Sequence, residues 1–327
     1  MPSLSRRAFV GAVTASAIGR RSEAQGASFD TVQIVTGATP GEPASQLCRL
    51  VGNALHGTDY AATVQVDSRS MESRSIIASL KGAPSDGSVL LGTWGSTLDF
   101  DPLVDPKLTY DPFEDVQPII MACTSDFTLA VGPAIPISVR TLKDYIAWCE
   151  GDPKQANFTS SAPGSLGHLM GVMLGKSAGI NLWHVASRGL QPAIDDLIAG
   201  KIQVVCGPLG PLLQHAYAGR VSLLGVSGPK RSRFAMGIPT FAEQGLTEVV
   251  FSEWFGFFTP GDTSSRVALS ANEALRKALA TKEVTDGLLG LGLDAKISTP
   301  AELAQRLKSD HERFGALVRK MHFTAAT

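Results

Sequence analysis

Residues 31–55, TVQIVTGATPGEPASQLCRLVGNAL, decide the fold that we expect of this chain. The apolar run at 31–36 is typical of a buried β-strand, Pro40 and Gly41 predict a sharp turn, and residues 45–55 have the spacing of a helix. A strand that turns directly into a helix is the repeating unit of α/β proteins. The turn is either simple topology, or it forms with the helix start the mouth of a ligand-binding site.

The same alternation of strands and helices continues along the chain. Further strands are predicted at residues 62–67, 88–93, 118–124, 127–133, 155–161, 181–186, 201–207 and 221–228, and further helices at 72–81, 141–149, 166–177 and 190–199. This order indicates an α/β protein whose mainly parallel sheets are covered by helices on both faces.

Two lobes are expected, because 327 residues suffice for two domains and the β–α rhythm restarts after residues 133–136. Two long extended segments, at 116–131 and 248–260, are each long enough to cross between lobes. A chain that crosses twice predicts a discontinuous first lobe and a continuous second one. The predicted first lobe is 27–127 plus 252–327, completed by two helices at 265–280 and 300–321, and the second is 128–251.

The N-terminus resembles a twin-arginine export signal. Ser5–Arg6–Arg7–Ala8–Phe9–Val10 precedes an apolar stretch, 8–18, that is too short to span a bilayer, and small residues follow near 24–27. We expect residues 1–26 to be such a signal and the mature chain to be periplasmic. An amphipathic N-terminal helix of a cytosolic protein is the weaker alternative.

Composition and charge exclude several classes of protein. With 44% hydrophobic and 18% charged residues the chain is globular, and a net charge of -1 implies no broad attraction to nucleic acid or to anionic lipid. The cysteines lack metal-binding spacing and are expected to be buried as small apolar residues, with a bridged pair left open: Cys48, Cys123, Cys149 and Cys206. The histidines show no metal-binding spacing either, so neither a metal nor a cofactor is expected.

Motifs for catalysis are missing from the sequence. It contains no GxSxG, GxxxxGK[ST] or GxGxxG pattern. An enzyme would have to assemble its site from unrelated segments, with Glu42, His168 or Asp126 as candidate catalytic residues. We treat that possibility as a distant alternative to a binding protein.

Four turns rich in Gly, Pro, Ser and Thr follow predicted strands and open predicted helices, at residues 39–41, 92–96, 160–165 and 207–210. Free backbone N–H groups and the helix dipole at such turns suit an anionic group such as a carboxylate. One turn of this kind is ordinary β–α geometry. Four of them, divided between two lobes, favour a ligand-binding cleft between the lobes.

Several blocks are similar to those of one family: LTYDPFEDVQPI at 108–119, DGSVLLGTWGS from Asp86, SSAPGSLGHL from Ser160 and HVASRGLQPAIDDLIAGKIQVV from His184. Over essentially all of the mature length the chain resembles the periplasmic solute receptors of tripartite tricarboxylate transporters, the Bug family. The resemblance implies a two-lobed periplasmic-binding-protein (Venus-flytrap) receptor without catalysis or cofactor. It also implies delivery of a small organic acid to membrane transporter subunits, by a receptor that we expect to be a monomer. A ligand sensor that feeds a signalling system is the alternative.

The chain departs from the family pattern at the loops that face the ligand. Glu42 replaces the second glycine of a P-G-G turn, Ser45 replaces an aspartate, and the next loop keeps only Arg69. A change of ligand would preserve the scaffold and alter the pocket residues. Relaxed selection on the pocket would produce the same pattern of substitutions. We expect backbone amides to take one carboxylate, with Arg74 or Arg69 beside Glu42.

Glu42, Trp94 or Phe127 would then address an amino, amide or aromatic far end of the ligand, unless Glu42 and Arg74 point to solvent. The predicted ligand-binding residues are Pro40, Gly41, Glu42, Ser45, Arg74, Thr93, Trp94, Gly95, Ser96, Phe127, Ser160, Ser161, Gly164, Ser165, His168, Gly207 and Pro208.

Overall fold

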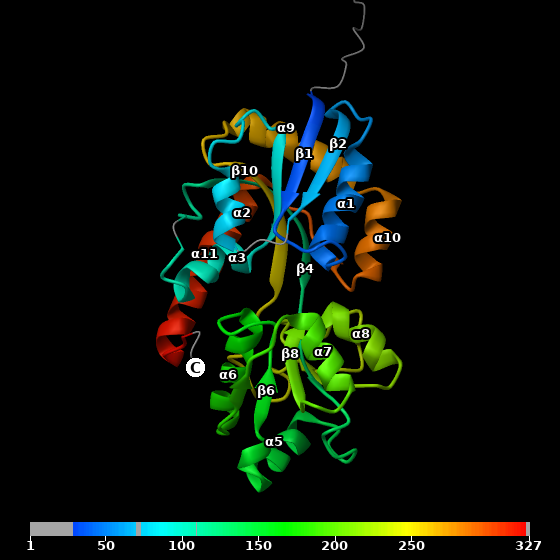
Figure 1. The fold of residues 1–327 in the computed structure, drawn as a ribbon, viewed down its shortest axis with the longest axis vertical. Coiled ribbons are helices and arrows are strands. Elements are labelled where there is room, and N and C mark those ends of the chain that lie inside the picture. The colour runs from blue at the N-terminus through cyan, green and yellow to red at the C-terminus, as the bar shows by residue number, and fades with distance from the viewer. Residues whose placement is uncertain (1–28, 70–72, 109, 325–327) are drawn as a thin grey trace, which may run out of the picture.

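The computed structural model describes residues 29–69, 73–108 and 110–324. Two β-sheets lie one beyond the other along the long axis of the molecule, and helices cover both of them (Figure 1). The predicted export signal at residues 1–26 lies outside the described residues. Within the described ranges, no helix is long and apolar enough to cross a membrane.

The first sheet has six strands in the order β11–β4–β10–β3–β1–β2. Alternate residues of a strand point to opposite faces, so Val32 and Ile34 of β1 join one apolar core and Val35 joins another. The strands are β1 (Phe29–Thr36), β2 (Ala61–Ser68), β3 (Val89–Trp94), β4 (Val116–Ser125), β10 (Glu253–Pro260) and β11 (Asp294–Ala295). One face is covered by α1 (Pro43–Leu55), α9 (Ser265–Leu279) and α10 (Lys282–Gly290), and the other by α2 (Ser73–Leu80), the short α3 (Ser96–Asp99) and α11 (Pro300–Met321).

The second sheet has five strands in the order β7–β6–β8–β5–β9. Here too the alternation divides the cores, because Val204 and Cys206 of β8 face one core and Val205 faces the other. The strands are β5 (Phe127–Val131), β6 (Asn157–Thr159), β7 (Trp183–Val185), β8 (Val204–Pro208) and β9 (Ser222–Val226). Helices α5 (Leu142–Gly151) and α6 (Leu166–Ala178) cover one face, and α7 (Leu190–Ile198) and α8 (Leu209–Tyr217) cover the other.

The predicted α/β fold with two sheets is confirmed, but the sheets are mixed rather than mainly parallel. Strands β1, β2 and β3 are parallel, as are β6, β7 and β8, whereas β10 and β5 run antiparallel to the strands beside them. The reason is topological. Strands β5 and β10 begin where the chain arrives from the other sheet, so each runs away from the junction that the two strands beside it approach.

The C-terminal region contains more structure than the two predicted helices. Helix α10 was not predicted, because Gly287 and Gly290 interrupt its apolar pattern. Gly287 is needed for close packing, since a Cβ there would lie 2.3 Å from the Leu50 side chain of α1. Helix α11 packs on β4 of the first sheet as expected, but its end also reaches the second sheet, where Phe314 and Phe323 share a core with strand β5 (Figure 1).

The four cysteines are buried and unpaired, which settles the open question of a bridged pair. Burial raises the pKa of the Cys48 thiol to about 12, so it is an inert apolar side chain of the α1 core. Among the described residues, no group of three or more His, Cys, Asp or Glu side chains could hold a metal ion.

Candidate ligand-binding site

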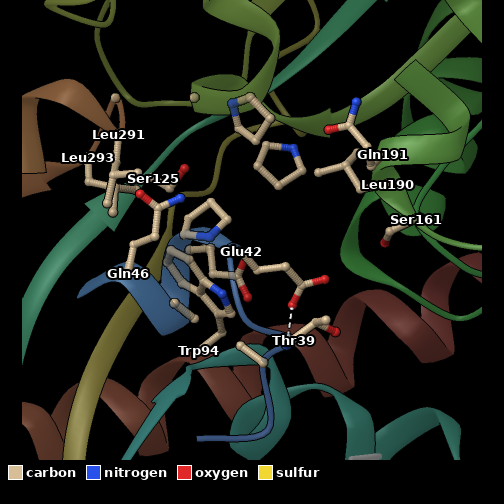
Figure 2. Close-up of a pocket in the computed structure, with 18 of the residues that line it drawn as sticks. Thr39, Glu42, Gln46, Trp94, Ser125, Ser161, Leu190, Gln191, Leu291 and Leu293 are labelled. Carbon is tan, nitrogen blue, oxygen red and sulfur yellow. Dashed lines mark hydrogen bonds between the residues drawn. The ribbon is translucent and has the colours of Figure 1, made fainter. Parts of the chain in front are cut away.

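A cavity of about 960 Å³ lies between the two sheets, and we call it the front cavity. Its lining comes from the ends of strands in both sheets and from the turns that follow them. Figure 2 shows Glu42, Gln46 and Trp94 on one side, and Ser161, Leu190 and Gln191 on the other. The carboxyl ends of strands in both sheets therefore converge on one space, as the four turns predicted.

The turn before α1 closes on itself. Gly41 has φ of 98°, a left-handed conformation that favours glycine. The Glu42 amide donates to the Thr39 carbonyl over 3.0 Å, and the Thr39 amide donates to Glu42 Oε2 over 2.9 Å (Figure 2). Gln46 Nε2 donates to the Gly41 carbonyl over 2.6 Å. The Glu42 carboxylate thus lines the cavity while it occupies a backbone N–H of its own turn.

The first turn of α1 lies at the cavity wall with its end uncapped by any described side chain. Pro43 at the first helical position has no N–H to satisfy. The N–H groups that follow point out of the helix end, where the dipole favours negative charge. This part of the wall can accept an anionic group without a basic side chain.

The turn after β3 brings Thr93, Trp94 and Ser96 to the cavity, but not Gly95. A Cβ on Gly95 would lie 2.3 Å from the ring of Trp254. Glycine at this position is therefore required by packing and does not contact the cavity. The Trp94 ring is held edge-on by Phe255, with ring centroids 5.2 Å apart.

Glu253, the first residue of β10, is a buried carboxyl at the cavity that the sequence reasoning missed. The Ser96 hydroxyl donates to Glu253 Oε1, and the Ser96 backbone also bonds the carboxylate. Burial raises the pKa of Glu253 to about 7, although the hydrogen bonds from Ser96 lower it in part. A single charged residue within the apolar segment 249–260 was the signal that could have identified it.

In the second sheet's turn after β6, Ser161 and Ser165 line the cavity, whereas Ser160, Gly164 and His168 lie behind them. The Ser165 hydroxyl caps α6 by accepting from the His168 amide over 3.3 Å. It also donates to Ser160 Oγ over 3.2 Å. The Gly164 amide donates to His168 Nδ1 over 3.0 Å. His168 is therefore a buried brace for this turn.

Other predicted residues are divided between the lining and the layer behind it. Phe127 and Pro208 line the cavity, but Gly207 does not. Ser45 does not line it either, because it is fully buried and its Oγ lies 2.8 Å from Ser68 Oγ, which ties α1 to β2. The side chain of Arg74 is outside the described part of the structure, although its backbone lies in α2.

Lining residues that the sequence did not single out come from scattered segments. The polar ones include Thr36, Ser125, Gln46 and Gln191, and the apolar ones include Leu190, Leu291 and Leu293. Leu291 and Leu293 follow α10, the helix that was not predicted. No motif connects these segments, so only the fold brings them together.

The front cavity carries carboxylates but no described cation. Glu42 and Glu253 line it, and among its described lining residues there is no Lys, Arg or His. Arg69 is paired with Asp67 through Nε, 2.6 Å from Oδ2, and does not line the cavity. A ligand carboxylate must then be held by backbone N–H groups and hydroxyls, and the two carboxyls are free to accept from donor groups of the ligand.

The three candidate catalytic residues do not form one site. Glu42 lines the front cavity, His168 is buried behind its wall, and Asp126 lines a different cavity. The hydroxyls of Ser161 and Ser165 have no described histidine or carboxylate bonded to them as a base.

Residues 58–323 match the family described as the tripartite tricarboxylate transporter family receptor. The chain belongs to this family. The fold and the solute-receptor family that the sequence blocks implied are thus confirmed. Solved proteins of the same fold include the periplasmic binding protein BugD and a TctC solute-binding protein from Polaromonas.

Relatives of known sequence support the assignment along most of the chain. The UPF0065 protein of the tcbD–tcbE intergenic region of Pseudomonas sp. strain P51 is 30% identical over 85% of this chain and 82% of its own. Protein BugT of Bordetella pertussis is 24% identical over 88% of both chains. A solved R. palustris protein with adipate has a TM-score of 0.81 at 23% identity, covering 91% of this chain and 98% of its own.

Proposed function

We propose that this receptor binds a small organic acid in the front cavity and delivers it to the membrane subunits of a tripartite transporter. The family membership supports the transport role. The R. palustris relative of the same fold holds adipate, a linear dicarboxylate, which supports an organic acid as the ligand class. Within this chain, the uncapped start of α1 and the hydroxyls of Thr93 and Ser161 are the groups that would hold a carboxylate.

The observation that carries the ligand class is the charge of the front cavity. Glu42 and Glu253 line it without a described cation beside them. A second ligand carboxylate about 4 Å from Glu42 would meet repulsion of about 1 kcal/mol in water, rising to about 4 kcal/mol at an effective dielectric of 20. We therefore propose a ligand with one carboxylate on the α1 turn and a donor at its other end, such as an amino or amide group, or an aromatic ring against Trp94.

Domain closure would link ligand binding to the delivery of the ligand. We propose that the lobes 27–127 plus 252–327 and 128–251 move as bodies about the two crossing segments. A ligand that contacts both walls favours the closed state by its additional contacts there. We further propose export by the twin-arginine route through residues 1–26, and a monomeric receptor in the periplasm.

The test is calorimetric titration of the purified mature protein with three groups of acids: amino acids and amides, aromatic acids, and citrate-like tricarboxylates. We expect stoichiometric binding to a member of the first two groups, with the ligand recovered unchanged. A preference for tricarboxylates would overturn the proposed ligand class. Conversion of a bound ligand into product would favour the enzyme alternative.

A further inference from the structure

A second cavity, of about 950 Å³, lies behind the hinge. Ser125 of β4 lines the front cavity, whereas its neighbours Thr124 and Asp126 line the second one. In the returning segment, Glu253 lines the front cavity and Ser252 lines the second. Because side chains alternate along an extended chain, the two cavities lie on opposite faces of the same crossing segments. We call the second one the hinge-back cavity.

The hinge-back cavity is strongly cationic, in contrast to the front cavity. Its cationic side chains come from the loop after β9 and from the β11–α11 region, which pack with different sheets. They are Lys230, Arg231, Arg233, Lys296, Arg306 and Arg313, against the carboxylates Asp126, Asp294 and Asp310.

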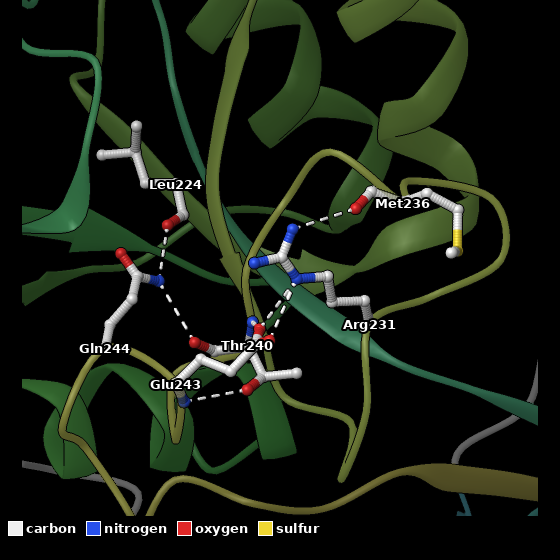
Figure 3. A network of polar contacts seen from close by, with 6 residues as sticks. All are labelled: Leu224, Arg231, Met236, Thr240, Glu243 and Gln244. Atoms are coloured by element: carbon white, nitrogen blue, oxygen red, sulfur yellow. Dashed lines mark hydrogen bonds and ion pairs between the residues drawn. The ribbon is translucent and has the colours of Figure 1, made fainter.

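The arginines are mostly committed to partners in the protein. Arg306 and Arg313 both pair with Asp310, and their guanidinium groups also donate to the carbonyls of Ser252 and Val250 over 2.9 and 3.0 Å. Arg231 pairs with Glu243, with Nε 3.0 Å from Oε2, and donates to the Met236 carbonyl (Figure 3). These three side chains form the fixed walls of the hinge-back cavity.

Three other cations are available to a ligand. Within the described ranges, neither Lys230 nor Lys296 has an ion-pair partner. Arg233 pairs with Asp294 across the two lobes at 3.5 Å, with 60% of its side chain exposed. An exposed pair at that distance contributes little and is easily exchanged for another anion.

We propose that the hinge-back cavity is the docking site for an acidic segment of a protein partner, and that this segment binds the closed receptor better than the open one. The inference rests on the proposed function, because a transporter must distinguish loaded receptors from empty ones. The volume is in the range of pockets that enclose many ligand atoms, about 300–1,000 Å³, and two flexible lysines suit successive carboxylates of a chain.

The preference for the closed state follows from the geometry of the hinge. The Ser252 hydroxyl donates to Asp126 Oδ1 over 2.6 Å and joins the two crossing segments at the wall of the hinge-back cavity. A rotation about these segments that narrows the front cavity must widen the space on their opposite face. It would separate Arg233 from Asp294 and free a third cation for the acidic segment. Ligand and partner would then raise each other's affinity reciprocally.

The first experiment measures the binding of fluorescein-labelled hexaglutamate to the mature protein by fluorescence anisotropy at low ionic strength. We expect the double variant Lys230→Gln, Lys296→Gln to bind about tenfold more weakly. The control is Lys277→Gln, Lys282→Gln, which removes two exposed lysines elsewhere and changes the net charge equally. Equal weakening in both double variants would overturn the proposal, as would tripolyphosphate competing at a lower concentration than unlabelled hexaglutamate, since that marks a small-anion site.

The second experiment tests the release of Arg233 from Asp294. Asp294→Asn frees Arg233 and is expected to tighten hexaglutamate binding about threefold, whereas an unchanged affinity would overturn the release step. The organic acids that titrate the front cavity should bind the lysine variants as they bind the wild type. Loss of hexaglutamate binding with intact acid binding is the expected signature of the site. Failure of every acid to bind the wild type would contradict the proposed function instead.

Discussion

The front cavity and the hinge-back cavity share two crossing segments but differ in charge. The front one is lined by Glu42 and Glu253 without a described cation, whereas the hinge-back one is lined by six cationic side chains. Neighbouring residues such as Ser125 and Asp126 face opposite cavities. The difference teaches that a protein with almost no net charge can present two unlike electrostatic sites, one suited to a small solute and one to an acidic partner.

The largest expected effect is a loss of folding stability, and it tests whether the arginines paired with Asp310 are structural rather than available to a ligand. Asp310 is buried, pairs with Arg306 and Arg313, and accepts from Trp254 Nε1 over 3.0 Å. Asp310→Ala should lower the free energy of unfolding by about 3–5 kcal/mol, because it leaves two partly buried cations uncompensated. Urea unfolding measures this change.

The matched control is Asp286→Ala, which breaks an i,i+4 pair with Lys282 on an exposed surface. Its effect should be under about 1 kcal/mol. An equal loss of stability in both variants would show that the arginines around Asp310 are not structural. The distinction between fixed and available cations in the hinge-back cavity would then be wrong.

The next effect concerns the buried carboxyl of the front cavity. Burial raises the pKa of Glu253 to about 7 in the folded protein, above its ordinary value of 4.5. Between these pH values the unfolded chain has lost a proton that the folded protein keeps. The stability that the neutral carboxyl contributes is therefore complete below about pH 4.5 and is lost as the pH rises through 7.

Glu253→Gln should remove this dependence. Relative to the variant, the wild type is expected to lose about 3 kcal/mol between pH 4.5 and pH 8, as measured by urea unfolding at several pH values. Parallel stability curves for the two proteins would show that Glu253 titrates as an exposed carboxyl does.

A smaller effect tests the hydroxyls that are proposed to hold the carboxylate. Thr93→Val keeps the shape of the side chain and removes its donor, so the affinity for the organic acid should fall by about 1 kcal/mol. Thr285→Val on α10, whose hydroxyl bonds only its own helix at 3.0 and 3.1 Å, serves as the control and should leave the affinity unchanged. Unchanged affinity in Thr93→Val would remove that residue from the site.

An effect of similar size concerns the exposed carboxylate of the α1 turn. Glu42→Gln keeps an oxygen that can accept from the Thr39 amide but removes the charge from the front cavity. Affinity for dicarboxylates should rise about fivefold, the effect of removing roughly 1 kcal/mol of repulsion in water, with stability unchanged. Calorimetry with adipate measures it, and a fall in adipate affinity would show that Glu42 does not repel the ligand.

Much of the fold could be predicted because it depends on local sequence patterns. The strand of residues 31–36 and the helix that follows were found by apolar spacing, and the crossing segments by their length. Helix α10 was missed because Gly287, which interrupts its apolar pattern, serves a contact with Leu50 that only the packed structure reveals. The antiparallel directions of β5 and β10 depend on which sheet the chain joins, and no local pattern fixes that.

The site was predicted less completely than the fold. Turns rich in Gly, Ser and Pro identified Pro40, Glu42 and Ser165 as cavity-lining residues, because their backbone chemistry is local. The same patterns could not separate Ser161, which lines the front cavity, from Ser160, which bonds His184 Nε2 over 2.9 Å behind it. One step along a chain changes which way a side chain points, and composition carries no such information.

The sequence by itself determined that this chain is an α/β receptor of a known transporter family, with a cavity at the ends of its strands, since these follow from periodicity and matching blocks. Only the tertiary structure decided that Glu253 joins Glu42 at the front cavity and that the cations gather behind the hinge. Those residues are far apart along the chain, and only the folded arrangement of their segments brings them together. On the crossing segments themselves, the alternation of side chains places Glu253 at the front cavity and Ser252 at the hinge-back cavity.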